Sequence, residues 1–178
     1  NFMQKVPLQD KYGELFKKMA QMTHAASKID ETNVYQKANP EMRSFMYGMV
    51  KENLLPNSRL AYKENFENFY DQVCAGKRGL ILMEHYANTD LPAFFYLLEQ
   101  SGSKKLADLA NRIVAIAGMK LNEESPVVRA FAEGFTRVVI YPTRSLNKNE
   151  EKAVSEEEAK NEEQRARKIN MAAMHAMD

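Results

Sequence analysis

Three short apolar runs, separated by stretches with helical spacing, constrain the fold of this chain more than any other feature. The runs cover residues 79–83, 112–117 and 136–141. Apolar runs of this length are typical of strands buried on both faces of a sheet. The intervals contain candidate helix-capping residues, which are Thr89 or Asp90 in the first and Ser125 in the second. This alternation predicts an α/β fold with a mixed, largely parallel sheet flanked by helices.

The first 76 residues predict a smaller, all-helical N-terminal domain. Apolar residues recur three or four positions apart through three stretches of this region. Asn39 followed by Pro40 indicates the start of the second helix, and Gly76 indicates the end of the third. We therefore expect a helical domain over residues 1–76 and an α/β domain over residues 77–178.

The composition excludes several classes of protein. Lys and Arg number 25 against 24 Asp and Glu, so the formal net charge is +1 and no broad basic field indicates a nucleic-acid partner. The longest apolar run, residues 80–83, is too short to span a bilayer. Cys74 is a single cysteine in an apolar pattern, which favours a packed thiol. Three scattered histidines disfavour a structural zinc site, and we expect neither a metal nor a cofactor.

Both ends of the sequence lack the signals of a complete chain. The start has neither the charged nor the apolar segment of a signal peptide. From Asn147 onward, charges of both signs lead into an amphipathic helix that continues to Asp178 without a Gly or Pro stop. We therefore expect a piece of a longer protein, with an α/β domain that is incomplete at its C-terminus.

The strongest candidate for chemistry is His85 with Asp90, in the polar stretch after the first apolar run. The strand would end at His85 and the next helix would begin at Asp90, at the sheet edge where α/β proteins bind ligands. A tight turn would let Asp90 accept the imidazole Nδ1 proton, which leaves Nε2 to act as a general base. Helix capping by Asp90 explains part of this spacing without chemistry. For His24 and His175 we expect ordinary structural or surface positions.

A histidine and an aspartate separated by four residues, between an apolar strand and an apolar helix, resemble the signature of the glycerolipid acyltransferases. More narrowly, the chain resembles the soluble glycerol-3-phosphate acyltransferases of plant plastids and related bacteria. Five stretches in order support this resemblance, namely residues 45–48 (FMYG), 84–93 (EHYANTDLPA), 117–120 (AGMK), 125–134 (SPVVRAFAEG) and 139–141 (VIY). The similarity covers residues 35–145.

The resemblance implies transfer of a fatty acyl group to the 1-hydroxyl of glycerol 3-phosphate, the first step of phospholipid synthesis. The acyl donor would be a thioester of acyl carrier protein or of coenzyme A. His85 would take the hydroxyl proton, and Asp90 would orient His85 and stabilise the imidazolium. It also implies a location in the bacterial cytoplasm or the plastid stroma, and leaves peripheral membrane contact open.

The phosphate of the acceptor requires cationic donors, and this family binds it partly with a lysine–histidine pair after the third strand. The matching positions are Arg144 and Ser145. Arg144 keeps the charge, whereas Ser145 departs from the family pattern and offers only a neutral hydrogen bond. Lys120 and Arg137 are weaker candidates, and Arg137 lies in a predicted strand, where an arginine can simply point to solvent. The alternative for Arg144 is an exposed loop arginine.

Further parts of the expected enzyme are less specific. The family carries another arginine-containing turn, which would follow Asp178 in this chain. Residues 94–98 would line a channel for the acyl chain, although apolar helical stripes more often form core. The basic pairs at 77–78 and 104–105 would receive the acidic acyl carrier protein, although such pairs often serve only solubility.

Two alternative functions remain at this stage. The first is acylation of 1-acylglycerol 3-phosphate, an acceptor that already carries one acyl chain. The second is a non-catalytic helical or lipid-binding interaction module, which the Met-rich and aromatic stripes over residues 42–73 favour.

Overall fold

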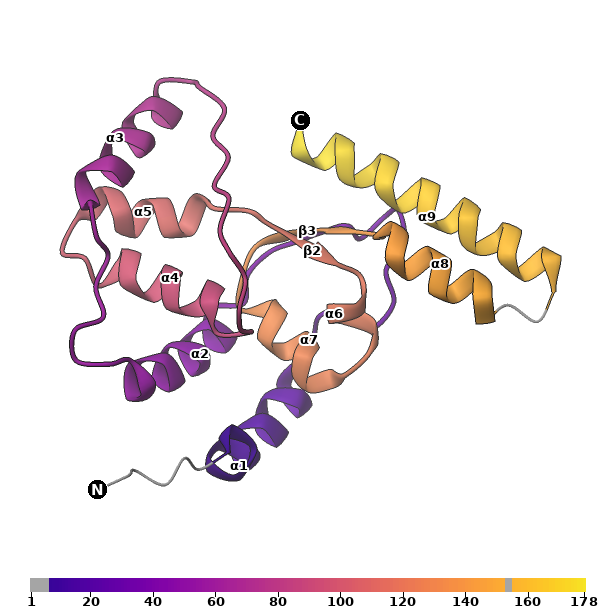
Figure 1. The fold of residues 1–178 in the computed structure, drawn as a ribbon, viewed down its shortest axis with the longest axis horizontal. Coiled ribbons are helices and arrows are strands. Elements are labelled where there is room, and N and C mark those ends of the chain that lie inside the picture. Colours follow the sequence, from indigo (N-terminus) through magenta and orange to yellow (C-terminus); the bar gives the residue numbers. More distant parts are fainter. Residues whose placement is uncertain (1–6, 153–154) are drawn as a thin grey trace. The chain divides into compact units, whose positions relative to one another are not determined.

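The structure, a computed structural model, describes residues 7–152 and 155–178 of the chain (Figure 1). The described residues pack as two compact units. The sheet unit comprises Asn1–Arg43 and Val114–Asp178, and the helical unit comprises Ser44–Ile113. The chain therefore leaves the sheet unit within one helix, builds the helical unit, and returns.

The sheet unit contains three short strands in the order β1-β3-β2 among the described residues. β3 pairs antiparallel with β1 and parallel with β2, in a register that sets Gly118 opposite Ile140. The parallel strands are joined through α6 and α7, the helical crossover that such a pair requires. The strands are β1 (Tyr35–Gln36), β2 (Ala115–Gly118) and β3 (Arg137–Ile140).

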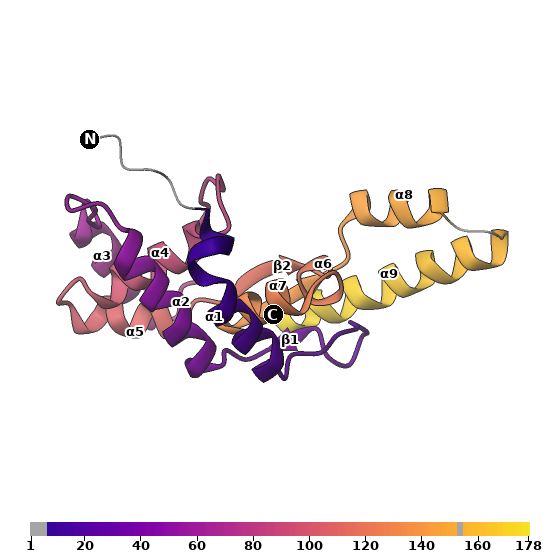
Figure 2. The same cartoon turned by 90° about the horizontal axis from the view of Figure 1, so that it is seen from below.

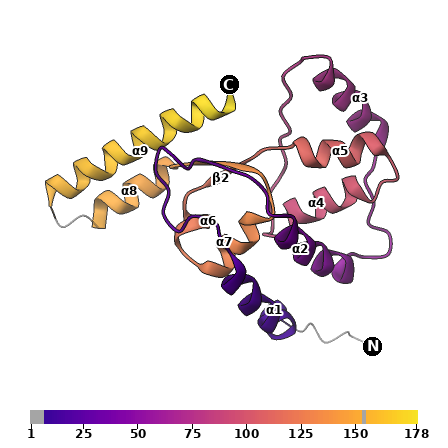
Figure 3. The ribbon, with the colours of Figure 1, turned by 180° about the vertical axis from the view of Figure 1, so that it is seen from behind.

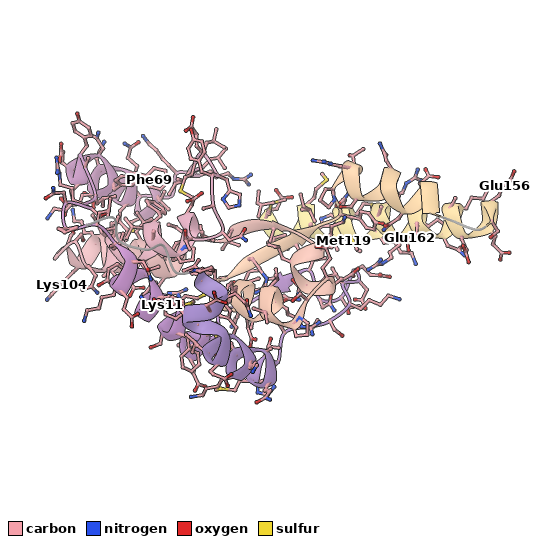
Figure 4. The ribbon with its side chains drawn as sticks, turned by 60° about the horizontal axis from the view of Figure 1, so that its bottom comes forward. Lys11, Phe69, Lys104, Met119, Glu156 and Glu162 are labelled. Carbon is pink, nitrogen blue, oxygen red and sulfur yellow. The ribbon has the colours of Figure 1, made fainter. Side chains whose placement is uncertain are left out.

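Helices cover this small sheet. Phe16 of α1 packs edge-on against Phe131 of α7, with ring centroids 5.2 Å apart. Ile169 of α9 is fully buried in the cluster that contains Val139 and Met119, and Met119 is labelled in Figure 4. α8 and α9 lie side by side (Figures 1 and 2). The helices of this unit are α1 (Leu8–Met22), α6 (Lys120–Glu123), α7 (Pro126–Glu133), α8 (Thr143–Lys152) and α9 (Glu156–Met177).

The helical unit is built from α3, α4, α5 and most of α2. Its core comes from the apolar faces of these helices, and Phe95, Leu98 and Leu106 are fully buried. Figures 1 and 3 show α4 and α5 side by side. Tyr70 of α3 donates a hydrogen bond to Asp108 of α5 over 2.8 Å, which ties these two helices together. The bounds are α2 (Pro40–Asn53), α3 (Lys63–Cys74), α4 (Asp90–Glu99) and α5 (Lys104–Arg112).

The predicted fold class is wrong. The described residues are mostly helical, with a small three-stranded mixed sheet instead of a large, largely parallel sheet flanked by helices. The predicted strand at 79–83 is an irregular segment, in which Leu80 is 72% and Leu82 is 86% exposed. Gly79 lies so close to Phe69 of α3 that an added Cβ would sit 2.5 Å from the ring. An apolar run becomes a strand only when a neighbouring strand supplies a hydrogen-bonded ladder, and no ladder forms here among the described residues.

The second predicted strand is displaced for a local reason. α5 continues through Arg112, whose guanidinium pairs with Asp108 one turn earlier at 2.5 Å. β2 therefore begins at Ala115 instead of residue 112. The third strand is predicted over residues 136–141, and β3 runs from Arg137 to Ile140. Each end of the prediction is therefore within one residue of the observed end.

Candidate functional site

The structure brings His85 and Asp90 together in the helical unit. Asp90 is the first residue of α4, and its Oδ2 atom lies 3.2 Å from Nδ1 of His85. The same oxygen accepts hydrogen bonds from the backbone N–H groups of Tyr86, over 2.6 Å, and Ala87, over 2.7 Å. The carboxylate therefore turns back toward the preceding loop, so its bonds differ from those of a helix-capping aspartate, which accepts from the first helical turn.

Hydrogen bonding favours the ionised form of Asp90. The pKa of the Asp90 carboxyl is lowered, first by the Ala87 N–H and further by the Tyr86 N–H and by His85, while partial desolvation opposes the shift. A lowered pKa keeps Asp90 ionised at neutral pH. An ionised carboxylate at Nδ1 favours the tautomer with its proton on Nδ1, so Nε2 is the ring nitrogen left for proton transfer.

The surroundings of the pair differ from those expected. The His85 side chain is 65% exposed and that of Asp90 is 24% exposed. Because residues 79–83 form no strand, the pair does not follow a buried strand of the sheet. It instead follows an exposed apolar segment that includes Leu80, Leu82 and Met83. The hydroxyl of Tyr86, itself 84% exposed, donates to the carboxylate of Glu84.

The three phosphate-binding candidates lie in the sheet unit, near the carboxyl ends of two neighbouring parallel strands. Lys120 begins α6, two residues after β2 ends, and Arg144 lies in the first turn of α8, shortly after β3 ends. Arg144 is exposed, whereas Ser145 is 5% exposed. Lys120 forms an ion pair with Glu124 at 3.4 Å. Both cations therefore follow the carboxyl ends of neighbouring parallel strands, and the Ser145 N–H donates to the Pro142 carbonyl in the turn beside Arg144.

Arg137 is not a solvent-facing strand residue, which corrects the expectation for it. It is 2% exposed, and it donates hydrogen bonds to the Ala132 carbonyl over 2.9 Å and to the Gln36 side chain. Burial lowers its pKa to about 10, although Glu133 opposes this shift. Arg137 therefore joins β1, β3 and the end of α7 in a buried polar cluster.

Other residues that the sequence singled out pack in the core of the helical unit or form ion pairs. Phe95 and Leu98 are buried core of the helical unit, and Phe94 packs against Phe66 with ring centroids 5.6 Å apart. Lys105 forms an ion pair with Asp71 at 2.7 Å. The expectation of a packed thiol is wrong, because Cys74 is exposed.

Glu133 is a polar anchor that the sequence analysis missed. It is 6% exposed, at the end of α7. Its carboxylate accepts hydrogen bonds from the Thr23 hydroxyl over 2.5 Å, the His24 N–H over 3.2 Å and the Asn39 side chain over 3.0 Å. These donors lie about a hundred positions away in the sequence, so no local spacing could have indicated them.

Comparison with models of protein families, with curated proteins and with solved structures gave no match for this chain. Within the described residues, no three His, Cys, Asp or Glu side chains lie close enough together to hold a metal ion. None of the helices described here has both the length and the apolar character needed to cross a membrane.

Proposed function

We propose that this protein transfers a fatty acyl group from a thioester of acyl carrier protein or coenzyme A to the 1-hydroxyl of glycerol 3-phosphate. The observation that carries the proposal is the contact between Asp90 Oδ2 and His85 Nδ1 at 3.2 Å. An oriented histidine and carboxylate form a general-base pair that activates a hydroxyl nucleophile supplied by the substrate. The resemblance of residues 35–145 to the soluble glycerol-3-phosphate acyltransferases supplies the substrate class, with the bacterial cytoplasm or plastid stroma as its location.

In this proposal His85 Nε2 removes the proton of the acceptor hydroxyl as the oxygen attacks the thioester carbonyl. The ionised Asp90 stabilises the resulting imidazolium through Nδ1. When the tetrahedral intermediate collapses, the new C–O bond remains, the C–S bond breaks, and the imidazolium returns its proton to the departing thiolate. The products are 1-acylglycerol 3-phosphate and a free thiol.

Phosphate binding by the residues that follow β2 and β3 is supported by the resemblance alone, because these residues lie in the sheet unit and His85 and Asp90 lie in the helical unit. Arg144 is the main hydrogen-bond donor proposed for the phosphate, because its exposed guanidinium can form two parallel hydrogen bonds to phosphate oxygens. Lys120 follows β2 but already pairs with Glu124 at 3.4 Å, and the buried Ser145 supports the turn. With a net charge of +1, acceptor binding depends on these few placed cations.

The test is acyl transfer by His85→Ala in the intact protein, with retained folding checked by circular dichroism. His175→Ala is the matched control, because it removes an imidazole from an exposed position on α9. We expect His85→Ala to lose about 10²–10⁴-fold in rate and the control to keep its rate. Undiminished transfer by folded His85→Ala would refute the proposal. Transfer to 1-acylglycerol 3-phosphate in preference to glycerol 3-phosphate would refute the assigned acceptor.

A further inference from the structure

Large apolar side chains are exposed on the 77–86 segment, which lies between α3 and α4 in the helical unit. Leu80 is 72%, Leu82 is 86% and Tyr86 is 84% exposed, and Met83 is also exposed. Single exposed apolar residues are normal on a protein surface, but several close together mark a site that contacts another apolar surface. The 77–86 segment is therefore a candidate interaction surface.

Packing contacts and hydrogen bonds hold this segment near both ends. Gly79 lies against Phe69, which is labelled on α3 in Figure 4, so that an added Cβ would sit 2.5 Å from the ring. At the other end, the Tyr86 and Ala87 N–H groups donate to the Asp90 carboxylate over 2.6 and 2.7 Å. The exposed side chains between these points therefore project from a supported loop.

Charged residues are unevenly placed along the segment. Lys77 and Arg78, both exposed, directly precede the leucines. Glu84 and Asp90 lie at the other end, where their carboxylates accept hydrogen bonds from the hydroxyl and the N–H group of Tyr86. Positive charge is thus concentrated beside the exposed leucines, and Lys and Arg next to apolar side chains complement the anionic headgroups of a lipid bilayer.

A lipid surface accounts for the exposed side chains, whereas an added strand does not. Ile81 is less exposed than Leu80 and Leu82 on either side of it, so the two leucines face solvent together. A strand from another chain would hydrogen-bond the backbone edge of the segment and leave side chains on its face exposed. A bilayer would bury the leucines, with the Tyr86 ring at headgroup level, where tyrosine is enriched.

We propose that the 77–86 segment docks this protein on an anionic lipid bilayer. Leu80 and Leu82 enter the boundary between headgroups and acyl chains, and Lys77 and Arg78 contact lipid phosphates. The backbone of the segment stays within reach of interfacial water, which satisfies the hydrogen-bonding groups that no ladder pairs. This inference goes beyond the proposed function and does not rest on it, because lipid binding is measured without substrate turnover.

Tryptophan fluorescence tests whether the segment enters the bilayer, because the sequence contains no tryptophan. Leu82→Trp places a single fluorophore in the segment, and Leu55→Trp is the matched control, since Leu55 is 74% exposed just after α2. The full chain is mixed with vesicles of phosphatidylcholine and phosphatidylglycerol in equal parts. We expect a blue shift and quenching by brominated acyl chains for Leu82→Trp and neither for Leu55→Trp. No response from Leu82→Trp, or the same response from both, would overturn the inference.

Flotation with the same vesicles measures the apolar contribution to binding. Leu80→Ser and Leu82→Ser should each lower the partition coefficient about tenfold, because each loses a side chain that the bilayer buries. Leu55→Ser should keep the partition coefficient of wild type. Circular dichroism verifies that these substitutions at exposed positions keep the fold. Unchanged binding of Leu80→Ser and Leu82→Ser, or an equal loss in Leu55→Ser, would refute docking through this segment.

The cations are tested separately. Lys77→Gln and Arg78→Gln should each weaken binding to these vesicles about fivefold, a difference that shrinks as salt is added. Lys51→Gln removes a positive charge from an exposed position on α2 and should leave binding unchanged. Equally tight binding of wild type to vesicles of pure phosphatidylcholine would contradict docking on an anionic surface.

Sedimentation equilibrium without lipid tests the alternative occupant, which is a second copy of the chain. We expect the same oligomeric state for wild type and Leu82→Ser. A wild-type dimer that dissociates in Leu82→Ser would overturn the inference in favour of pairing between copies through this segment.

Discussion

Replacing Asp90 by Asn or by Ala separates the geometry of the His85 site from its charge. One oxygen of Asp90 accepts from His85 Nδ1 and from the backbone N–H groups of Tyr86 and Ala87. An asparagine Oδ1 in the same position can still accept from both backbone groups, so Asp90→Asn should keep the loop conformation. Asp90→Ala loses the negative charge and the acceptor of both backbone groups.

The exposure of the pair sets the expected magnitude. A general base contributes about 10²–10⁴-fold in rate, and the larger values require a charge partner shielded from water. The His85 side chain is 65% exposed and that of Asp90 is 24% exposed, so solvent screens the interaction. We therefore expect Asp90→Asn to lose about 10²-fold in kcat, at the low end of this range. Asp90→Ala should lose more, because the loop no longer holds His85 in place.

The assay is steady-state release of thiol from an acyl thioester with saturating glycerol 3-phosphate. Amide exchange at Tyr86 and Ala87 reports the loop conformation in each variant. The expected order of kcat is wild type, then Asp90→Asn, then Asp90→Ala, with protected amides in the first two. Full activity of Asp90→Asn would show that the negative charge has no role and would refute this reasoning.

Three further predictions concern stability and pH. Glu133→Ala should lose about 3–5 kcal/mol in a urea titration, because three donors lose a carboxylate acceptor; no loss would contradict its role as an anchor. Gly79→Ala should lose about 1–3 kcal/mol by overpacking against Phe69, and Phe69→Leu should restore part of it; additive losses would contradict the clash. Since the folded state lowers the Asp90 pKa below 3.8, its stabilising bonds persist at neutral pH and are lost as pH falls through that lowered value. The protection factor of the Ala87 amide, which is its intrinsic exchange rate divided by its observed rate, should therefore fall through this pH range in wild type. It should show no such transition in Asp90→Asn.

Local signals in the sequence predicted α1 and α2, but not α5 or α8. Periodic apolar residues with Pro40 at the start identified α2, and the spacing of Leu8, Tyr12 and Phe16 identified α1. The turn from His85 to Asp90 was also predictable, because a side chain reaching back five residues depends on local backbone geometry alone. These features require no information from distant parts of the chain.

The errors concern features that depend on distant partners. Leu80 and Leu82 have the composition of a buried strand, but a strand also needs a neighbour, which the pattern does not specify. A solvent-facing position was the alternative for Arg137, and no sequence pattern singled out Glu133, yet long-range hydrogen bonds hold both inside the sheet unit. The hydrogen bond from the Tyr141 N–H to the Asn170 side chain likewise joins positions 29 residues apart.

The most direct test of the central claim is thiol release from an acyl thioester by wild-type protein, measured with and without glycerol 3-phosphate. The proposed general-base role of His85 predicts that release depends on glycerol 3-phosphate, saturates with it, and yields an equal amount of 1-acylglycerol 3-phosphate. No release, or release at the same rate without the acceptor, would contradict the claim that His85 and Asp90 activate its hydroxyl.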